Sequence, residues 1–147
     1  MPSSGADNPQ GPNSIQTFMV YFRMHADMYM QNWEASTLID LNIIAVPVSR
    51  KLVRGGYTYD DLPDYMISEA GIIINTTPVG MAPATDEMPP IDYSCLREGQ
   101  LLFDLIYNPP VTAFLARGEE HGCMTVNGEE MFLIQAQLAW EKWNEEE

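Results

Sequence analysis

The stretch LLFDLIYNPPVTAFLARGEEHGCMTV, residues 101 to 126, contains a strand, a helix and a second strand in succession. Its continuous apolar run, 101–106, is typical of a strand that is buried on both faces of a sheet. Asn108 can cap the following helix, Pro109 suits the first turn, and 124–126 predicts a brief second strand. Two strands joined through a helix pair in parallel. The predicted apolar stripe of the helix comprises Val111, Phe114 and Leu115.

The same alternation of strands and helices extends upstream. Residues 43–48, IIAVPV, and 71–75, GIIIN, are short apolar runs that predict two further buried strands. Between them, residues 60–69 predict a helix that is opened by Asp60 or Asp61. This pattern predicts an α/β fold that is Rossmann-like, with a mostly parallel sheet and helices on both faces.

The first forty residues are less regular, which makes the N-terminal strand, turn and helix of this fold incomplete or atypical. The run TFMVYF, 17–22, fits a buried strand, and a buried helical turn fits so short a run as well. Apolar spacing predicts a helix over 27–41, and the polar composition of 1–14 predicts a disordered tail before one domain at 15–147. In the usual order of a nucleotide-binding sheet, the first strand lies between the second and the fourth. We therefore expect 17–22 in the middle of the sheet, beside 101–106.

The C-terminal part predicts a final helix and, with the strands, the place of a ligand. Asn127 can cap this helix, with Glu130 three positions on as its capping-box partner. Ligands of parallel sheets bind at the carboxyl ends of the strands. We therefore expect the site in the segments just after Val48, Asn75 and Ile106.

The composition excludes several classes of partner. The 21 acidic and 7 basic residues give a formal charge of −14, which opposes binding to nucleic acid or to an anionic membrane. Cys95 and Cys123 fit no metal spacing and no disulfide framework, and His25 and His121 have no ligand-spaced partner. We find no secretory leader and no long apolar segment, so we expect a cytoplasmic protein without a bound metal.

Three segments carry a resemblance to a known family: NTTPVGM at 75–81, FDLIYNPPVTAFL at 103–115 and NGEEMFLIQAQLAW at 127–140. In this order and spacing they resemble the C-terminal domain of shikimate dehydrogenases, the enzymes that reduce 3-dehydroshikimate to shikimate with NADPH. The resemblance extends from about residue 38 to Trp143. Upstream, the family has a strand followed by a glycine-rich G-x-G-G-A turn, where this chain reads RMHADMYM at 23–30.

A basic cluster, which we define as Ser49, Arg50, Lys51 and Arg54, follows the second predicted strand. In a nucleotide-binding fold this position contacts the adenosine ribose, and guanidinium groups favour the 2'-phosphate of NADP. The alternative is a solvated loop that helps to keep an acidic protein soluble. The resemblance identifies the segment with the family's NADP-selecting motif, with Ser49 in place of a usual Asn and Lys51 in place of a usual Thr.

The resemblance also implies ligand contacts after the third and fourth strands. The loop that begins with Asn75 and Thr76 would line the cofactor side of the cleft, Leu105 would touch the nicotinamide, and Tyr107 would contact the shikimate carboxylate. Alternation along a strand would place Leu105 and Tyr107 on the same side. An ordinary strand-to-loop turn and a buried, hydrogen-bonded tyrosine are the alternatives.

Gln135 lies on the final helix one turn after Met131 and beside Ile134 and Leu138, so we expect it on an apolar face where an amide needs a partner. A buried amide bonded to a neighbouring carbonyl is one interpretation. The resemblance instead makes Gln135 a ligand of the substrate hydroxyls, with Gly128 near the nicotinamide.

As a whole, the resemblance implies an NADP-dependent oxidoreductase of the shikimate pathway, which leads to chorismate and the aromatic amino acids. The family's catalytic Lys and Asp belong to an N-terminal substrate domain that we expect this chain to lack, so it would contain no catalytic residue of its own. A separate catalytic-domain chain or a homo-oligomer would then complete the site. The alternative is a non-catalytic remnant or interaction module that keeps the fold. Since the glycine-rich turn is missing, we expect NADP binding to be weak or lost.

Overall fold

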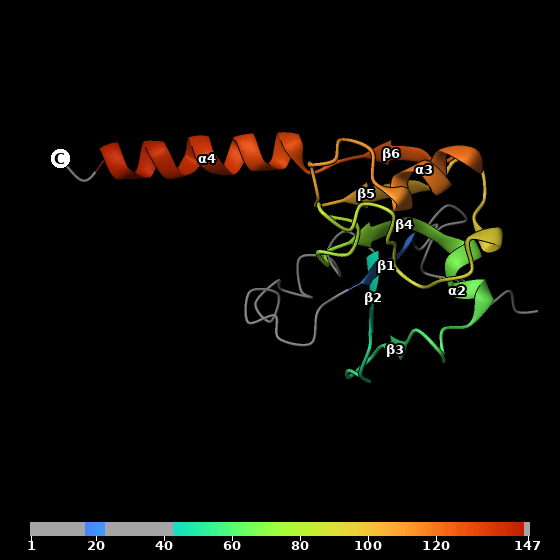
Figure 1. Ribbon diagram of the computed structural model, residues 1–147. Helices are drawn as coiled ribbons and strands as arrows, with labels where there is room; N and C mark the ends of the chain where they lie inside the picture. The colour runs from blue at the N-terminus through green and yellow to red at the C-terminus, as the bar shows by residue number, and fades with distance from the viewer. Residues whose placement is uncertain (1–16, 23–42, 146–147) are drawn as a thin grey trace, which may run out of the picture.

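The computed structural model describes residues 17–22 and 43–145 of the chain (Figure 1). The predicted tail at 1–14, the predicted helix at 27–41 and the segment RMHADMYM lie outside the described residues. The elements are β1 (Thr17–Phe22), β2 (Ile43–Ser49), β3 (Tyr57–Thr58), α2 (Asp64–Glu69), β4 (Ala70–Asn75), η1 (Tyr93–Cys95), β5 (Leu101–Asp104), α3 (Ala113–Glu120), β6 (Met124–Val126) and α4 (Glu129–Asn144).

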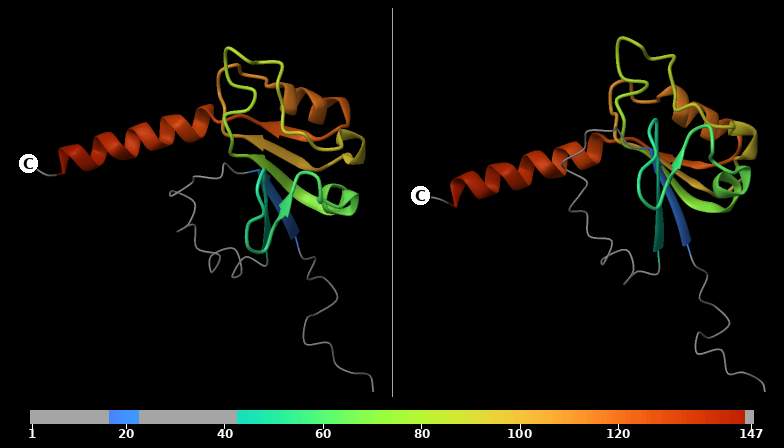
Figure 2. Two further views of the ribbon diagram at one scale, coloured as in Figure 1. Left: turned by 60° about the horizontal axis from the view of Figure 1, so that its bottom comes forward. Right: turned by 90° about the horizontal axis from the view of Figure 1, so that it is seen from below.

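The six strands form one parallel sheet in the order β3-β2-β1-β4-β5-β6 (Figure 2). This is the strand order of a Rossmann-like domain. The predicted fold class is therefore confirmed, as are the predicted strands at 43–48, 71–75 and 124–126, each to within one residue.

The run 17–22 forms β1 and lies in the middle of the sheet, as predicted, with parallel neighbours on both sides. The prediction that 101–106 is its neighbour is wrong, because β1 pairs with β4 (Ala70–Asn75) instead. The error arises from β3, which consists of Tyr57 and Thr58 alone and pairs with the end of β2. Two residues give no alternation pattern, so this strand could not be recognised from the sequence and 101–106 was predicted as the fourth strand when it is the fifth.

One face of the sheet is buried beneath α2, η1 and α3. Val20, Ile73 and Leu102 from three adjacent strands are completely buried on this face. Phe114 of α3 joins the same core. On the opposite face the neighbouring positions are more open, and Met124 of β6 is 59% exposed. The two faces of the sheet thus differ in how well the described residues cover them.

Helix α2 begins at Asp64, so the prediction of a start at Asp60 or Asp61 is wrong. Asp61 instead belongs to a turn with Thr58, whose hydroxyl donates to the Asp61 carboxylate at 2.8 Å. Pro63 precedes the first helical residue in an extended conformation. A proline disfavours helical geometry in the residue before it, which explains why the helix starts only after Pro63.

Helix α3 is capped by Thr112 and not by Asn108, which corrects the second predicted start. The Thr112 hydroxyl accepts from the Leu115 amide at 3.3 Å and donates to Asp104 at 2.7 Å. The strand before it ends at Asp104, two residues earlier than predicted. The Asp104 carboxylate accepts the Ile106 amide at 3.0 Å, which turns the chain out of the sheet.

Helix α4 is the longest described helix and extends away from the sheet (Figures 1 and 2). The predicted cap is wrong, because Gly128 is the N-cap of α4 and no side chain caps the helix. Asn127 lies one residue earlier, where its side-chain carbonyl accepts from the Glu129 amide at 3.0 Å. None of the residues of α4 is buried. Among the described helices, none is both long and apolar enough to cross a bilayer.

Candidate functional site

The site is built at the carboxyl ends of β4 and β5, where Asn75 and Asp104 are direct neighbours in the sheet register. Both side chains are completely buried, and the Asn75 amide donates to Asp104 at 3.2 Å. Asp104 also accepts from Thr112 and from the Ile106 amide. Burial raises the pKa of Asp104 above its ordinary value, while these three hydrogen bonds oppose the rise. The Asp104 carboxylate therefore connects the end of β4, the segment after β5 and the start of α3 by hydrogen bonds.

The buried Asn75 side chain forms hydrogen bonds that fix the conformation of the loop after β4. The Asn75 side-chain carbonyl accepts from both the amide and the hydroxyl of Thr77, at 3.1 and 2.6 Å. Its amide group donates to the Val79 carbonyl at 3.1 Å. Thr76 is half-buried between these residues. The loop is thus pre-organised by a buried amide, and it is not an ordinary solvated turn.

Gly128 lies against the segment that follows β5, so that two more predicted site residues meet. Its amide donates to the Ile106 carbonyl at 3.1 Å. A Cβ atom at this position would lie 1.8 Å from the Leu105 carbonyl oxygen. Only glycine permits this approach of two backbone segments. The glycine therefore sets where α4 starts relative to Leu105.

Tyr107 lies beyond the end of β5, so the alternation expected for Leu105 and Tyr107 does not apply to them. The expected alternative of a buried tyrosine is also wrong, because Tyr107 is 45% exposed. Its ring stacks on Phe132 of α4, with ring centroids 4.9 Å apart and an interplanar angle of 26°. Tyr107 therefore lies at the surface, beside the first turn of α4.

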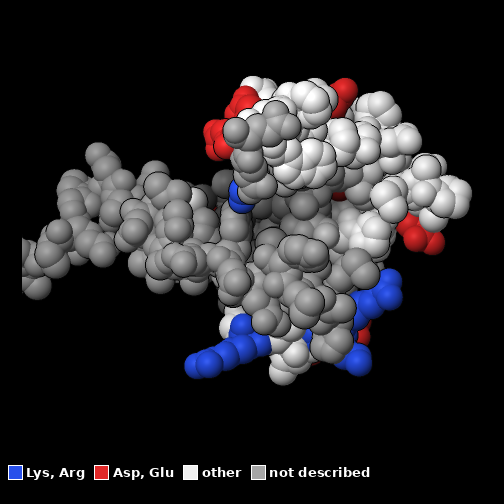
Figure 3. Space-filling view, turned by 90° about the vertical axis from the view of Figure 1, so that its left-hand side faces the viewer, with Lys and Arg blue, Asp and Glu red and all other residues white. Residues whose placement is uncertain are grey.

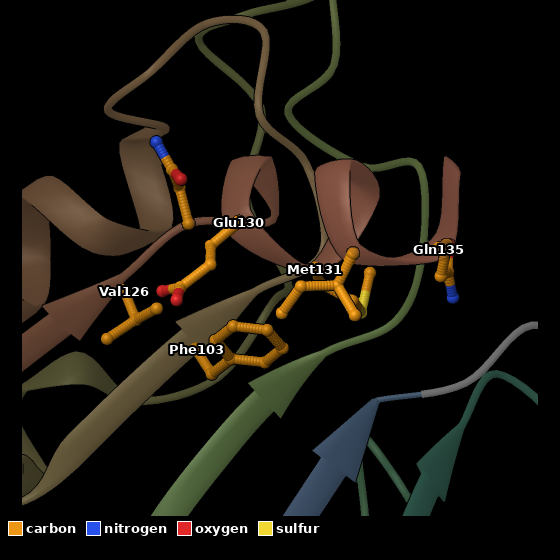
Figure 4. Close-up of a pocket in the computed structure, with 7 residues that line it drawn as sticks. Phe103, Val126, Glu130, Met131 and Gln135 are labelled. Carbon is orange, nitrogen blue, oxygen red and sulfur yellow. The ribbon is translucent and has the colours of Figure 1, made fainter. Parts of the chain in front are cut away.

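Gln135 lines a pocket of about 300 Å³ between the start of α4 and the sheet (Figure 4). The buried-amide interpretation is wrong, because Gln135 is exposed. As predicted, it shares its side of the helix with Met131 and Ile134, which line the same pocket. The walls are mostly apolar, and the polar groups come from Gln135 and two other side chains. The complete lining is Phe103, Val126, Asn127, Glu130, Met131, Ile134 and Gln135.

The basic cluster follows the carboxyl end of β2, where Ser49 is buried and the three cationic residues are exposed. The Ser49 hydroxyl has no hydrogen-bond partner in the described part of the chain. No described carboxylate forms a salt bridge with Arg50, Lys51 or Arg54. Figure 3 shows basic side chains gathered at the bottom of the molecule, where β2 and β3 lie in Figure 1. Among the described residues, the cluster thus combines three exposed cations without a carboxylate partner and a buried hydroxyl without a hydrogen-bond partner, which are groups that an anion can accept hydrogen bonds from.

Tyr59 adds a polar group close to this cluster. Burial raises the pKa of Tyr59 to about 12, while the charge of Arg50 opposes the rise. The phenol therefore stays protonated at neutral pH and remains able to donate a hydrogen bond. Tyr59 is not among the predicted site residues, because it lies after a glycine pair and not directly after a predicted strand.

The structure brings some of the predicted site residues into contact and leaves others apart. Asn75, Leu105 and Gly128 belong to one connected set of backbone and side-chain contacts. The basic cluster lies two strands away, at the end of β2. Asp104 and Thr112, whose hydrogen bonds connect this set, were not predicted as site residues. An acidic residue inside the apolar run LLFDLI was the available signal, since a buried carboxylate requires hydrogen-bond donors.

A third group, Asp64, Asp92 and Cys95, brings three potential metal-ligand atoms within 4.8 Å of one another. The Asp92 carboxylate already accepts from the amide and hydroxyl of Ser94, which lower its pKa. Burial raises the pKa of the Cys95 thiol, so a metal ion would displace its proton at a greater cost than at an unperturbed cysteine. Cys95 and Cys123 are both free, as expected. We assign no metal to this group.

The searches of curated proteins and of solved structures find the same kind of protein. No protein-family model matches the chain. The chain is similar to the shikimate dehydrogenase (NADP(+)) of Methanococcus aeolicus, with 38% identity over 107 residues that make up 73% of this chain and 38% of that protein. It is also similar to the solved structure of shikimate 5-dehydrogenase from Listeria monocytogenes in complex with shikimate and NAD, with a TM-score of 0.66 and 25% identity.

The matched region is only part of each relative. It covers 90% of this chain and 53% of the Listeria monocytogenes chain. A shikimate dehydrogenase solved in complex with NADP+ shares the fold, with a TM-score of 0.68 at 23% identity, over 49% of its chain. The chain therefore spans about half or less of the length of the proteins that it matches.

Proposed function

The chain is a homologue of part of the shikimate dehydrogenases, and we propose that it is the NADP-binding half of such an oxidoreductase. The observation that carries the proposal is the basic cluster at the carboxyl end of β2, where no described carboxylate pairs with the guanidinium groups and no described group bonds to the Ser49 hydroxyl. This donor set fits the 2'-phosphate of NADP, because a phosphate takes bidentate hydrogen bonds from Arg. An NAD-selecting site would carry an acidic residue here.

The remaining residues have roles by similarity to the family. Asn75, Thr76, Leu105 and Gly128 would line the cofactor, and the nicotinamide supplies or accepts the hydride when NADP is bound. Tyr107 and Gln135 would bind the small-molecule substrate, shikimate or 3-dehydroshikimate. The described residues support neighbouring cofactor and substrate positions. Gln135 lines the pocket at the start of α4, and Leu105 lies against Gly128 at the same helix start. A proton donor is still required, and we propose that a catalytic-domain polypeptide supplies it.

The second candidate is a non-catalytic remnant or interaction module. The sequence supports it at one point, because glycine is absent between Gly11 and Gly55. Glycines allow backbone amides at a helix start to approach the pyrophosphate, and in their place the sequence has RMHADMYM at 23–30, which lies outside the described residues. The adenosine end of NADP fits the chain better than the pyrophosphate does.

We therefore expect the isolated chain to bind NADP weakly, with a dissociation constant well above micromolar, and to prefer it to NAD. Arg50→Ala and Arg54→Ala should each weaken NADP binding by about tenfold or more, because a charge-assisted hydrogen bond contributes roughly 1.5–3 kcal/mol. Isothermal titration calorimetry at low salt measures the affinities. Arg97→Ala is the matched control, since Arg97 is an exposed arginine that precedes β5 at the opposite end of the sheet. Equal affinity for NADP and NAD would contradict the assignment.

We also expect the isolated chain to show no shikimate oxidation with saturating NADP, because the acid/base pair of the family is not part of it. The assay follows NADPH absorbance at high protein concentration. Turnover that disappears in Gln135→Ala would mean that the chain contains a complete active site. Turnover that persists in that variant would point to a contaminating enzyme.

A further inference from the structure

Asn127 joins the segment after β5 to the first turn of α4 through both ends of its side chain. Its side-chain amide group donates to the Pro110 carbonyl at 2.9 Å. Its side-chain carbonyl accepts from the Glu129 amide at 3.0 Å. Asparagine suits this bridge, because one end of its side chain donates and the other end accepts. An aspartate of the same shape would place a carboxylate oxygen opposite the Pro110 carbonyl, and two acceptors form no hydrogen bond.

Tyr107 lies within the segment that this bridge fixes. The segment is held at one end by Asn127 and at the other by the Gly128 amide, which donates to the Ile106 carbonyl at 3.1 Å. Between these two points the Tyr107 ring stacks on Phe132 of α4, with ring centroids 4.9 Å apart. The place of the Tyr107 ring on α4 therefore depends on the hydrogen bonds on either side of it.

Asn127 is followed by Gly128, and an asparagine–glycine peptide is chemically labile. Because glycine has no side chain to hinder it, its nitrogen can approach and attack the side-chain carbonyl carbon of the asparagine. The other three asparagines in the part of the chain that the structure describes are less reactive, for different reasons. Asn108 precedes a proline, whose nitrogen carries no proton to lose. Asn75 is completely buried, and the amide that follows Asn144 donates within α4.

We propose that Asn127 is a deamidation site of this chain, and that its conversion releases Tyr107 from α4. The Gly128 nitrogen forms a bond with Cγ of Asn127 and the bond from Cγ to Nδ2 breaks, so that Nδ2 leaves as ammonia with the amide proton of Gly128. Water then opens the cyclic imide and gives aspartate or isoaspartate. Asn127 is only half-buried, so water reaches it.

The native contacts slow this reaction. The Gly128 amide donates to the Ile106 carbonyl and both ends of the Asn127 side chain are engaged, so the imide forms only when these hydrogen bonds open. After conversion the bridge does not form again, because aspartate has no donor for the Pro110 carbonyl and isoaspartate lengthens the backbone. The loss of ammonia makes the step one-way. Its consequence for substrate binding rests on the proposed function, in which Tyr107 contacts the substrate.

The first test follows the reaction in the 147-residue chain at mildly alkaline pH, in buffer and in guanidinium chloride, by mass spectrometry of proteolytic peptides. In buffer we expect Asn127 to react before the other three described asparagines. It should react about tenfold to a thousandfold more slowly than in the denaturant, because several hydrogen bonds have to open first. Equal rates would contradict the bridge. A native rate below this range, or an earlier reaction at another described asparagine, would contradict the assignment of Asn127 as the site.

The second test measures the environment of Tyr107 by ¹⁹F NMR of the chain labelled with 3-fluorotyrosine. The variant Tyr107→Phe assigns the resonance, and Phe132→Ala gives its position without the ring stack. In the deamidated chain and in Asn127→Asp we expect the Tyr107 resonance to move toward its position in Phe132→Ala. A resonance that stays in place in both samples would overturn the release of Tyr107.

Asn144→Asp is the matched control for this second test. It makes the same change of charge on the same helix and also removes a bond from a side-chain amide to a backbone carbonyl, that of Trp140 at 2.8 Å. It should leave the Tyr107 resonance unchanged. A shift as large as that in Asn127→Asp would mean that added charge on α4, and not the lost bridge, moves the ring.

NADP titration of the freshly purified chain separates this proposal from the proposed function. The basic cluster lies at the end of β2, whereas Asn127 follows β6 at the other edge of the sheet. A chain that deamidates at Asn127 as expected and does not bind NADP would contradict the proposed function alone. A chain that binds NADP while Asn127 fails the first test would contradict the deamidation site alone.

Discussion

Replacement of Asp104 by alanine is expected to lower the free energy of unfolding by about 2–6 kcal/mol, because two buried donors lose their acceptor at roughly 1–3 kcal/mol each. These donors are the Thr112 hydroxyl and the Ile106 amide, while the Asn75 amide keeps its second bond to Val79. Urea denaturation followed by far-ultraviolet circular dichroism measures the change. A loss below about 1 kcal/mol would show that the carboxylate does not hold the two loops.

Asp104→Asn is the matched control and adds a dependence on pH. Asparagine keeps an acceptor for the Ile106 amide, so we expect a smaller loss of stability than with alanine. The folded state has the raised pKa, so this contribution to stability is fully present below the unfolded pKa and is lost as the pH rises through the folded pKa. The unfolding free energy of the native chain relative to Asp104→Asn should therefore increase as the pH falls from neutral toward 4. A difference that is flat with pH would contradict the raised pKa.

Gly128→Ala is the second change with a large expected effect, at about 3 kcal/mol of unfolding free energy. The added methyl group would collide with the Leu105 carbonyl, which is backbone and has to shift as a whole. The shift should break the bond from the Gly128 amide to Ile106 and move the first turn of α4. Near-ultraviolet circular dichroism should report a change, because the Tyr107 ring stacks on Phe132 in that turn.

Gly99→Ala separates this collision from the loss of backbone freedom. Gly99 has a φ of +85°, and an added Cβ would meet no atom within 4 Å. Only the conformational strain applies there, at roughly 1–2 kcal/mol. If Gly99→Ala destabilised the chain as much as Gly128→Ala, the close approach of α4 to Leu105 would not be the cause.

The sequence predicted most strands and failed at most helix starts, for a physical reason. A buried strand leaves an apolar run such as IIAVPV or GIIIN, which depends on the residues of the strand alone. The start of α3 depends on Thr112, and Thr112 is held by Asp104, eight residues earlier in another element. Asn108 was an equally good cap by composition, so local rules could not choose between them.

The features of the candidate site also fall into those that the sequence predicts and those that depend on the tertiary structure. The order of strands and helices, the net charge and the basic cluster after β2 follow from the sequence by itself, because each depends on residue type and spacing along the chain. Only the tertiary structure decided that Asn75 meets Asp104, that Gly128 touches Leu105 and that Gln135 is exposed beside a pocket. These contacts join residues that are far apart in sequence, and their distances depend on the sheet register and on the direction in which α4 leaves the sheet. Residue spacing along the chain does not specify that direction, because a hydrophobic pattern shows which residues of a helix share a side and not which surface that side faces.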